Sequence, residues 1–252
     1  MEIAKLYQLF LTSQGIATDT RKIENDTLFF ALKGPNFNGN TYATQALQKG
    51  ASFAIIDESA YINNDKCILV DDVLQTLQLL ANYHRKQLGI PVIGIAGSNG
   101  KTTTKELTHT VLSTKYQTFA TKGNLNNHIG VPLSLLSIDK SIEIAILELG
   151  ANHIDELAAL CQIAEPSHGL ITNNGLDHLE GYGSFEGVVK GNSEIFYWLL
   201  KNKGIVFVNS HDEILMRMAA RFTNSLTYGA ETDFSYAQVV DHHFLIKVKT
   251  NE

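Results

Sequence analysis

A turn with two glycines, followed by a lysine and threonines, is the stretch of this chain best suited to chemistry. Gly97-Ser98-Asn99-Gly100 comes after a short apolar run, Val92–Ala96, and leads directly into Lys101 and Thr102. Glycines let a backbone turn sharply and bring its N–H groups close to a ligand, and a helix N-terminus favours an anion. The pattern predicts a binding loop for the phosphates of ATP with Mg²⁺. Its residues are Gly97, Ser98, Asn99, Gly100, Lys101, Thr102 and Thr103.

One position departs from the usual phosphate-binding loop. The first glycine of that motif, five residues before Gly100, is Ile95 here. A glycine-rich turn without a ligand is the alternative, and Lys101 would then be a solvated lysine at a helix start. The apolar run before the loop and the helical stretch after it favour the phosphate site.

A carboxylate ends a second apolar run, residues 142–149. Glu148 stands near the carboxyl end of that run, where parallel strands form a ligand crevice. A buried charge is costly unless it is paired or binds a metal. Glu148 is therefore predicted to bind Mg²⁺ beside the loop, the alternative being a strand-end glutamate that faces solvent.

Two further stretches place polar side chains at the same edge. Residues 170–175 form a strand that runs into a loop, and this loop delivers His178 as a predicted second metal ligand. Taken alone, an Asp-His pair is more often without chemistry. Residues 123–130 are rich in asparagine and glycine, which is a turn on its own, but asparagine amides also suit a sugar or amide substrate.

Strands and helices alternate along the chain, which predicts an α/β fold with a doubly wound, mostly parallel sheet. A small αβ domain, residues 1–85, is expected to precede a larger ATP-binding domain, residues 86–252, and an antiparallel pair is expected at 234–240 and 243–248. Helices are predicted at 3–11, 41–48, 73–88, 101–113, 131–136, 154–163, 185–200 and 213–222, and strands at 27–32, 53–56, 67–70, 92–96, 117–121, 143–149, 169–172 and 205–209.

Composition narrows the classes of function. The 252 residues carry 20 basic and 26 acidic side chains, so the net charge of -6 gives no electrostatic footprint for nucleic acid. Cys67 and Cys161 are too few for a disulfide framework or a zinc cluster. The N-terminus has no signal-peptide pattern and no apolar run reaches membrane length, so we expect a cytoplasmic protein, acting as a monomer without membrane insertion.

Several motifs in order resemble the Mur ligases, and the similarity extends over nearly the whole chain. Within that family they resemble the branch that joins D-alanyl-D-alanine to a UDP-N-acetylmuramoyl-tripeptide in peptidoglycan synthesis. The motifs are Gly-Ser-Asn-Gly-Lys-Thr-Thr (97–103), Gly-Asn-Leu-Asn-Asn (123–127), Glu-Leu-Gly-Ala-Asn-His (148–153) and Asp-His-Leu-Glu-Gly (177–181). Residues 19–22 and 29–34 resemble the family's uridine-nucleotide-binding domain.

The resemblance implies a mechanism and a role for each residue. ATP phosphorylates the substrate's terminal carboxylate to an acyl phosphate, and the incoming amine displaces phosphate to form the amide. The expected catalytic residues are Lys101, Asn173 and His178, and the expected Mg²⁺ ligands are Thr102, Glu148 and His178. The expected substrate contacts are Thr20, Arg21, Lys33 and Gly34 at the uridine diphosphate, and Asn126 and Asn127 nearer the muramoyl part.

Two features depart from the family. Members usually carry a carbamylated lysine at the position of Asn192, and Lys190 is expected to point elsewhere on its helix. The family's chains also continue beyond the position of Glu252, so we expect this chain to be a fragment that lacks the C-terminal domain. A sister ligase that adds another amino acid, or a module that only binds nucleotide and UDP-precursor, are the alternative functions.

Overall fold

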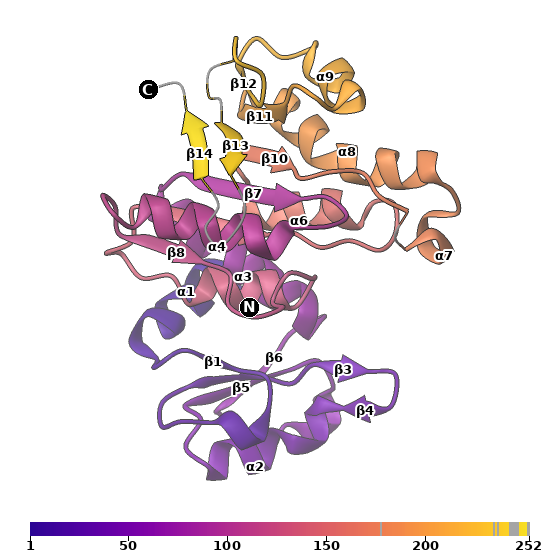
Figure 1. Ribbon diagram of the computed structural model, residues 1–252. Coiled ribbons are helices and arrows are strands. Elements are labelled where there is room, and N and C mark those ends of the chain that lie inside the picture. The colour runs from indigo at the N-terminus through magenta and orange to yellow at the C-terminus, as the bar shows by residue number, and fades with distance from the viewer. Residues whose placement is uncertain (177, 234, 236, 242–246, 251–252) are drawn as a thin grey trace. The chain divides into compact units, whose positions relative to one another are not determined.

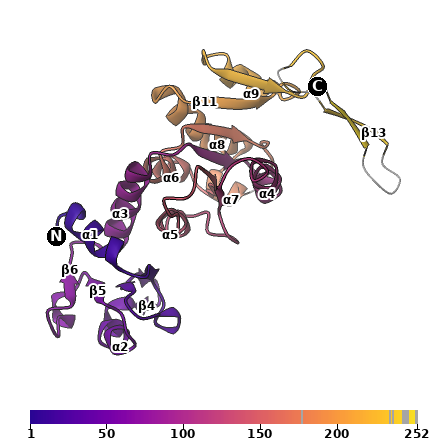
Figure 2. The ribbon, with the colours of Figure 1, turned by 90° about the vertical axis from the view of Figure 1, so that its left-hand side faces the viewer.

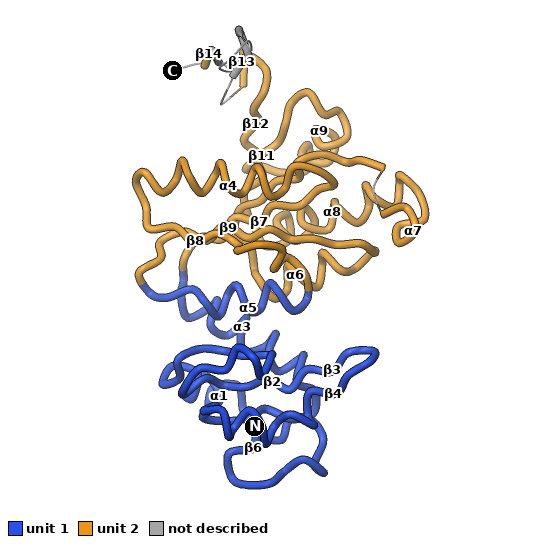
Figure 3. Tube along the Cα trace, turned by 60° about the horizontal axis from the view of Figure 1, so that its bottom comes forward, with its two compact units in different colours: residues 1–89, 128–140 blue, residues 90–127, 141–252 orange. Residues whose placement is uncertain are grey.

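The computed structural model describes residues 1–176, 178–233, 235, 237–241 and 247–250. The chain divides into two compact units (Figure 3), one of residues 1–89 with 128–140 and one of residues 90–127 with 141–252. Residues 128–140 fall in the range that the sequence assigned to the second domain. They join the first unit because their helix, α5, packs against α3 of that unit.

Unit 1 is built on a four-stranded parallel sheet with the strand order β1-β2-β5-β6. The central strands are apolar and almost fully buried, as expected for a parallel sheet that is covered on its faces. The strands are β1 (Ile16–Ala17), β2 (Leu28–Phe30), β5 (Phe53–Ile56) and β6 (Cys67–Leu69), and the helices are α1 (Ile3–Thr12), α2 (Ala43–Gln48), α3 (Val73–Leu88) and α5 (Gly130–Leu136). Short 3₁₀ turns are η1 (Thr20–Lys22), η2 (Gly39–Tyr42) and η3 (Ser59–Tyr61).

Helix α3 shows how the sequence sets the ends of an element. The Asp72 side chain accepts a hydrogen bond from the backbone N–H of Gln75 at 2.7 Å, which caps the helix N-terminus. Gly89 adopts a left-handed conformation with φ 65° and ends the helix. Between these signals, apolar residues at helical spacing bury one face, which is why the predicted bounds of this helix agree with the structure.

Unit 2 is built on a six-stranded sheet in which every neighbouring pair is parallel, as the sequence predicts. The order β12-β11-β10-β7-β9-β8 places β7 between β10 and β9, so the carboxyl ends of these three strands meet at one edge. The strands are β7 (Val92–Ala96), β8 (Thr118–Ala120), β9 (Ile144–Glu148), β10 (His168–Ile171), β11 (Ile205–Asn209) and β12 (Ser225–Tyr228). The helices are α4 (Lys101–Leu112), α6 (Glu156–Ala164), α7 (Leu179–Tyr182), α8 (Phe185–Lys201) and α9 (Glu213–Ala219).

Helices cover both faces of this sheet (Figures 1 and 2). Alternate residues of β7 point to opposite faces. Ile95 belongs to an apolar cluster that Leu112 of α4 joins, whereas Gly94 faces Ile195 of α8. A Cβ atom at Gly94 would lie 2.9 Å from the Ile195 Cδ1 atom, so glycine at this position lets α8 approach the sheet closely.

The structure contains several short elements that the sequence did not predict. Residues 33–40, for which no strand or helix was predicted, contain the hairpin of β3 (Lys33–Gly34) and β4 (Phe37–Asn38). Strands β1 and β12 and the short helix α7 were also not predicted. The antiparallel pair near the end consists of β13 (Ala237–Asp241) and β14 (Lys247–Thr250). Asp241 of the predicted turn is the last residue of β13, and residue 242 lies outside the described residues, as do 234, 236 and 243–246 of the predicted strands. No helix among the described residues is long and apolar enough to cross a bilayer.

Candidate nucleotide-binding site

The glycine loop joins β7 to α4 at the carboxyl edge of the sheet. Gly97 and Gly100 have φ angles of 117° and 80°, which favour glycine. The Lys101 ammonium group donates hydrogen bonds to the carbonyl oxygens of Gly97 and Ser98 at 2.5 and 2.9 Å, so it lies over the loop. No described side chain caps the N-terminus of α4, and its first N–H groups point into this region.

A second loop, after β10, is hydrogen-bonded to the glycine loop. The Asn173 side chain accepts from the Asn99 N–H at 3.2 Å and donates to the Asn99 carbonyl oxygen at 2.9 Å, as a paired peptide group does. The Thr172 hydroxyl donates to the same carbonyl at 2.7 Å. The Ser98 N–H donates to the Asn173 carbonyl at 3.0 Å, and the Gly175 N–H donates to the Ser98 hydroxyl at 2.8 Å.

These contacts give a physical account of the departure at Ile95. That side chain is fully buried within β7, so the loop proper is only the four residues between β7 and α4. A Cβ atom at Gly97 would collide with the Thr172 hydroxyl, so the two loops need glycine there to approach each other. The short glycine loop is instead positioned by hydrogen bonds to the loop after β10, residues 172–175, which is called the β10 loop below.

Glu148 ends β9 on the other side of the glycine loop. Its carboxylate is 3% exposed and accepts hydrogen bonds from the Thr102 hydroxyl at 2.9 Å and the Asn126 side-chain amide at 2.8 Å. Among the residues described, no cation pairs with it. A buried carboxylate next to a threonine hydroxyl suits Mg²⁺, which binds one or two protein oxygens together with substrate phosphates and water. Thr102 and Glu148 therefore fit the ion that the loop implies.

The asparagine loop lies against this carboxylate. The Asn126 carbonyl accepts from the Gly150 N–H at 2.8 Å, and a Cβ atom at Gly150 would come within 3.0 Å of the Asn126 amide. Glycine at 150 thus leaves room for the amide that reaches Glu148. Asn127, the other predicted substrate contact, is exposed.

His178 lies in a different cavity of unit 2. Together with Asn152, His153 and the start of α7 it lines a hollow of about 560 Å³. Glu156 shapes the wall of this cavity, because its carboxylate accepts from the N–H groups of Asn152 and His153. No hydrogen bond within the described part of the chain joins His178 to Thr102 or Glu148. A metal centre with three or more His, Cys, Asp or Glu ligands is also absent among the described residues.

The predicted uridine-diphosphate contacts belong to unit 1. Thr20 and Arg21 line a cavity of about 490 Å³ together with Phe37 and Tyr42, two residues that are 56% and 46% exposed. Hydrogen bonds from the Arg21 side chain and backbone lower the pKa of Asp19 to about 2. Lys33 and Gly34 do not line this cavity.

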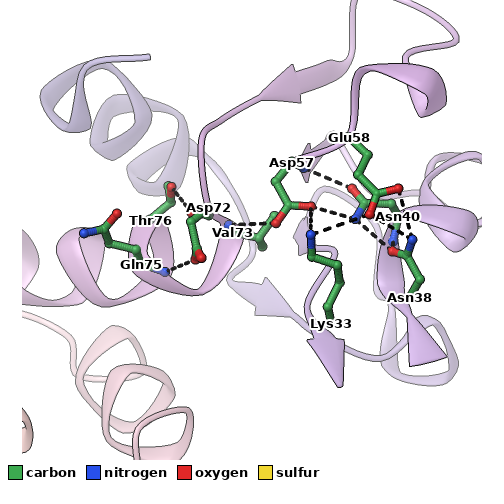
Figure 4. A network of polar contacts seen from close by, with 9 residues as sticks. All are labelled: Lys33, Asn38, Asn40, Asp57, Glu58, Asp72, Val73, Gln75 and Thr76. Atoms are coloured by element: carbon green, nitrogen blue, oxygen red, sulfur yellow. Dashed lines mark hydrogen bonds and ion pairs between the residues drawn. The ribbon is translucent and has the colours of Figure 1, made fainter. Parts of the chain in front are cut away.

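Lys33 belongs to a polar network at the base of the β3–β4 hairpin (Figure 4). Its ammonium group pairs with Asp57 at 3.1 Å and with Glu58 at 3.5 Å. Asn40, which is fully buried, donates to Asp57 at 2.8 Å. Burial favours the neutral form of Asp57, but the hydrogen bonds from Asn40 and Lys33 outweigh it and hold the pKa of Asp57 below its usual value. The network ties the hairpin that carries Phe37 to the end of β5.

Sequence reasoning missed several residues of the site. Thr172, Asn174 and Gly175 contact or support the glycine loop, and Lys105 is buried on α4 with its ammonium group 2.6 Å from the Thr121 carbonyl oxygen. The run of Asn-Asn-Gly directly after a buried strand was a usable signal for Asn174 and Gly175. The position of Lys105 depends on the packing of α4, which the sequence does not show.

The fold and this site define the class of protein: an α/β protein in which a P-loop-like turn stands at the carboxyl edge of a parallel sheet. A family described as "Mur ligase middle domain" matches residues 95–251, and one described as "Mur ligase family, catalytic domain" matches residues 12–98. The chain belongs to the Mur ligase family.

Two curated relatives that the chain matches share the same name. The chain is 39% identical over 239 residues to the UDP-N-acetylmuramoyl-tripeptide–D-alanyl-D-alanine ligase of Bacillus subtilis, covering 92% of this chain and 52% of the relative. It is 40% identical to the Escherichia coli protein of that name, with 79% and 44% covered. Among solved structures, the MurF ligase of Thermotoga maritima in complex with ADP matches with a TM-score of 0.83 and 33% identity, over 91% of this chain and 53% of that one. The chain therefore spans about half the length of these relatives.

Proposed function

We propose that this chain carries the ATP-binding and UDP-precursor-binding parts of a ligase that joins D-alanyl-D-alanine to UDP-N-acetylmuramoyl-tripeptide with formation of ADP and phosphate. The observation that carries the proposal is the Thr102–Glu148 hydrogen bond beside the loop covered by Lys101. It places a candidate magnesium site next to a candidate phosphate site, in a chain similar to ligases of that name.

In this proposal the chain's residues position and neutralise the transferring phosphoryl group. Lys101 and the N–H groups at the start of α4 bind the ATP phosphates, and Thr102 and Glu148 hold Mg²⁺, which supplies further positive charge. The γ-phosphoryl group passes to the precursor's terminal carboxylate, and the amine of D-alanyl-D-alanine then displaces phosphate. Asn173 acts by holding the loop. His178 and Asn152 line the cavity that we assign to the end of the precursor whose carboxylate accepts the phosphoryl group.

We assign the uridine end of the precursor to the cavity of unit 1. The exposed aromatic residues Phe37 and Tyr42 offer stacking surfaces to a planar base. Arg21 pairs with Asp19 at 2.6 Å, but its side chain stays 86% exposed and so can still donate to the diphosphate. Lys33 and Gly34 contribute through the hairpin that carries Phe37, because the Lys33 charge is paired with Asp57. Asn126 and Asn127 remain assigned to the muramoyl side. A cytoplasmic location agrees with the two free thiols, Cys67 and Cys161.

The alternative is a module that binds ATP and the precursor without turnover. The test is to measure phosphate release with ATP, UDP-N-acetylmuramoyl-tripeptide and one of three amines: D-alanyl-D-alanine, a diamino acid or glutamate. Both this chain and a longer protein that contains it are assayed. Phosphate release with D-alanyl-D-alanine, and not with the other two amines, supports the proposal. Release with another amine indicates a sister ligase, and binding of both ligands without release from either protein indicates the module.

A further inference from the structure

Asn192 lies on α8. Its side chain is buried next to the loop after β10, which is hydrogen-bonded to the glycine loop. Its side chain is 6% exposed, and its amide donates a hydrogen bond to the Asn174 side-chain oxygen at 3.0 Å. The Asn174 amide nitrogen is itself buried and has no hydrogen-bond partner among the described residues. The contact with Asn192 is therefore the side-chain hydrogen bond that ties Asn174 to the body of unit 2.

Asn174 stands between two residues that contact the glycine loop. Asn173, before it, pairs with the backbone of Asn99, and Gly175, after it, donates to the Ser98 hydroxyl. The order of contacts runs from α8 through Asn174 to the β10 loop and then to Ser98 and Asn99. The first and last steps are hydrogen bonds of 2.8–3.2 Å, and within the loop Asn174 is joined to Asn173 and Gly175 by peptide bonds.

Helix α8 is a firm support for such a chain of contacts. It has 17 residues, and Ile195 and Leu199 on it pack against Gly94 and Gly169 of the sheet. Two residues beyond Asn192, the Glu194 carboxylate accepts from the N–H groups of Asp155 and Ala158 at 2.7 and 2.8 Å and so caps α6. The same stretch of α8 thus holds the start of α6 and the β10 loop.

We propose that Asn192 is a positioning residue for nucleotide binding, which acts through Asn174 to keep the phosphate loop in its binding conformation. The proposal rests on the assignment of that loop to ATP. An asparagine amide cannot form a carbamate, so the proposed role of Asn192 needs no charge. Lys190, on the same helix, is exposed. A preorganised loop binds its ligand more tightly because less ordering is needed at the moment of binding.

The test compares Mg²⁺–ADP affinity by calorimetry in the wild-type chain, Asn192→Leu, Asn174→Leu and the double variant. Leucine keeps the size and branching of the asparagine side chain but neither donates nor accepts. We expect each single variant to bind roughly tenfold more weakly, because a buried hydrogen bond is lost and its partner is left unmatched. The double variant should be little worse than either single one, since both break the same contact.

Hydrogen exchange separates positioning from general weakening of the fold. Protection of the Ser98, Asn99 and Gly175 amides should fall in Asn192→Leu and in Asn174→Leu. Ile195→Val, a conservative cavity-forming change on the same helix, is the control and should lower the melting temperature without changing this protection or the affinity. Unchanged affinity in both asparagine variants, or an equal loss in Ile195→Val, overturns the proposal. If Lys101→Ala also leaves affinity unchanged, the assignment of the loop to ATP is what fails.

Discussion

Thr102 and Glu148 are 46 positions apart in the chain and are joined by a hydrogen bond of 2.9 Å. The contact follows from the strand order, because β7 pairs directly with β9 in a register that sets Ile95 opposite Glu148. Thr102 begins the helix that follows β7, so its hydroxyl and the carboxylate meet at the same edge. Two oxygen atoms from separate segments, the proposed Mg²⁺ ligands, are thus brought together at this edge.

Replacing Glu148 by glutamine should remove the magnesium-dependent part of nucleotide affinity. The amide keeps the size of the side chain but removes the negative charge, and a charge-assisted contact is worth about 1.5–3 kcal/mol. We therefore expect ADP to bind about ten- to a hundredfold more weakly in the presence of Mg²⁺, with little change in its absence. Glu143→Gln, at the other end of the same apolar run, is the matched control. Equal Mg²⁺ dependence in wild type and Glu148→Gln would argue against this ligand.

Phe37→Ala should weaken binding of a UDP-linked precursor to unit 1. Stacking of a base on an aromatic ring contributes about 1–3 kcal/mol by alanine substitution. The expected change is an increase in Kd of roughly five- to a hundredfold, measured by fluorescence or calorimetric titration with UDP-N-acetylmuramoyl-tripeptide. Ile62→Ala, which removes another exposed apolar side chain of unit 1, should leave Kd unchanged. A similar loss in both variants would point away from the cavity of Phe37 and Tyr42.

Unit 1 should lose stability on acidification because of His84. This side chain is 5% exposed, with Nε2 2.8 Å from the Ile138 carbonyl oxygen and Nδ1 3.1 Å from the Tyr7 hydroxyl. The carbonyl only accepts, so Nε2 carries the proton and Nδ1 accepts from Tyr7. Burial lowers the pKa of His84, and the charge of Lys140 lowers it further against the opposing effect of the Ile138 contact.

The sign of this effect follows from proton linkage. The unfolded chain binds a proton at His84 near pH 6.5, whereas the folded chain binds it only at lower pH. The free energy of unfolding should therefore fall as pH drops below about 6.5 and level off below the folded-state pKa. Urea unfolding at a series of pH values measures it, with His84→Gln as a variant that hydrogen-bonds but does not titrate. Parallel pH profiles for the two proteins would show that His84 is not responsible.

Nucleotide binding by this chain should be independent of bicarbonate. Asn192 stands where the family usually has a carbamylated lysine, and its neutral amide is hydrogen-bonded to Asn174. The Kd for Mg²⁺–ADP should stay within about twofold with and without added bicarbonate in carbonate-depleted buffer, which is a difference of less than about 0.5 kcal/mol. Asn192→Lys is the comparison, since that side chain can react with carbon dioxide. A bicarbonate response in wild type that disappears in Lys190→Ala would show that Lys190 carries the carbamate.

The elements with strong local signals were predictable from the sequence. Strand β7 and helix α3 match their predicted bounds because an apolar β-branched run, an aspartate cap and a terminal glycine are local features. Strand β12 was not predicted because Ser-Leu-Thr-Tyr at the sheet edge is only partly buried and shows no continuous apolar run. Its strand character comes from pairing with β11, which is a tertiary effect.

In the candidate site, too, some features have local sequence signals and others depend on tertiary contacts. The residue types of Lys101, Thr102 and Glu148 predict phosphate and metal chemistry, and the parallel sheet brings Thr102 and Glu148 within hydrogen-bonding distance. The pairing of Asn173 with the Asn99 backbone depends on the order of β10 and β7 in the sheet, and the two residues are 74 positions apart. Likewise, no local signal indicates that Lys33 pairs with Asp57 instead of facing the cavity.

The central claim is that the loop between β7 and α4 binds the phosphates of ATP. Calorimetric titration of Mg²⁺–ADP into the wild-type chain and into Lys101→Ala tests it most directly, with Lys115→Ala, an exposed lysine just beyond α4, as the control. We predict saturable binding to wild type and to Lys115→Ala, and a loss of roughly a hundredfold or more in Lys101→Ala with an unchanged melting temperature without nucleotide. Wild-type affinity in a folded Lys101→Ala variant would contradict the account.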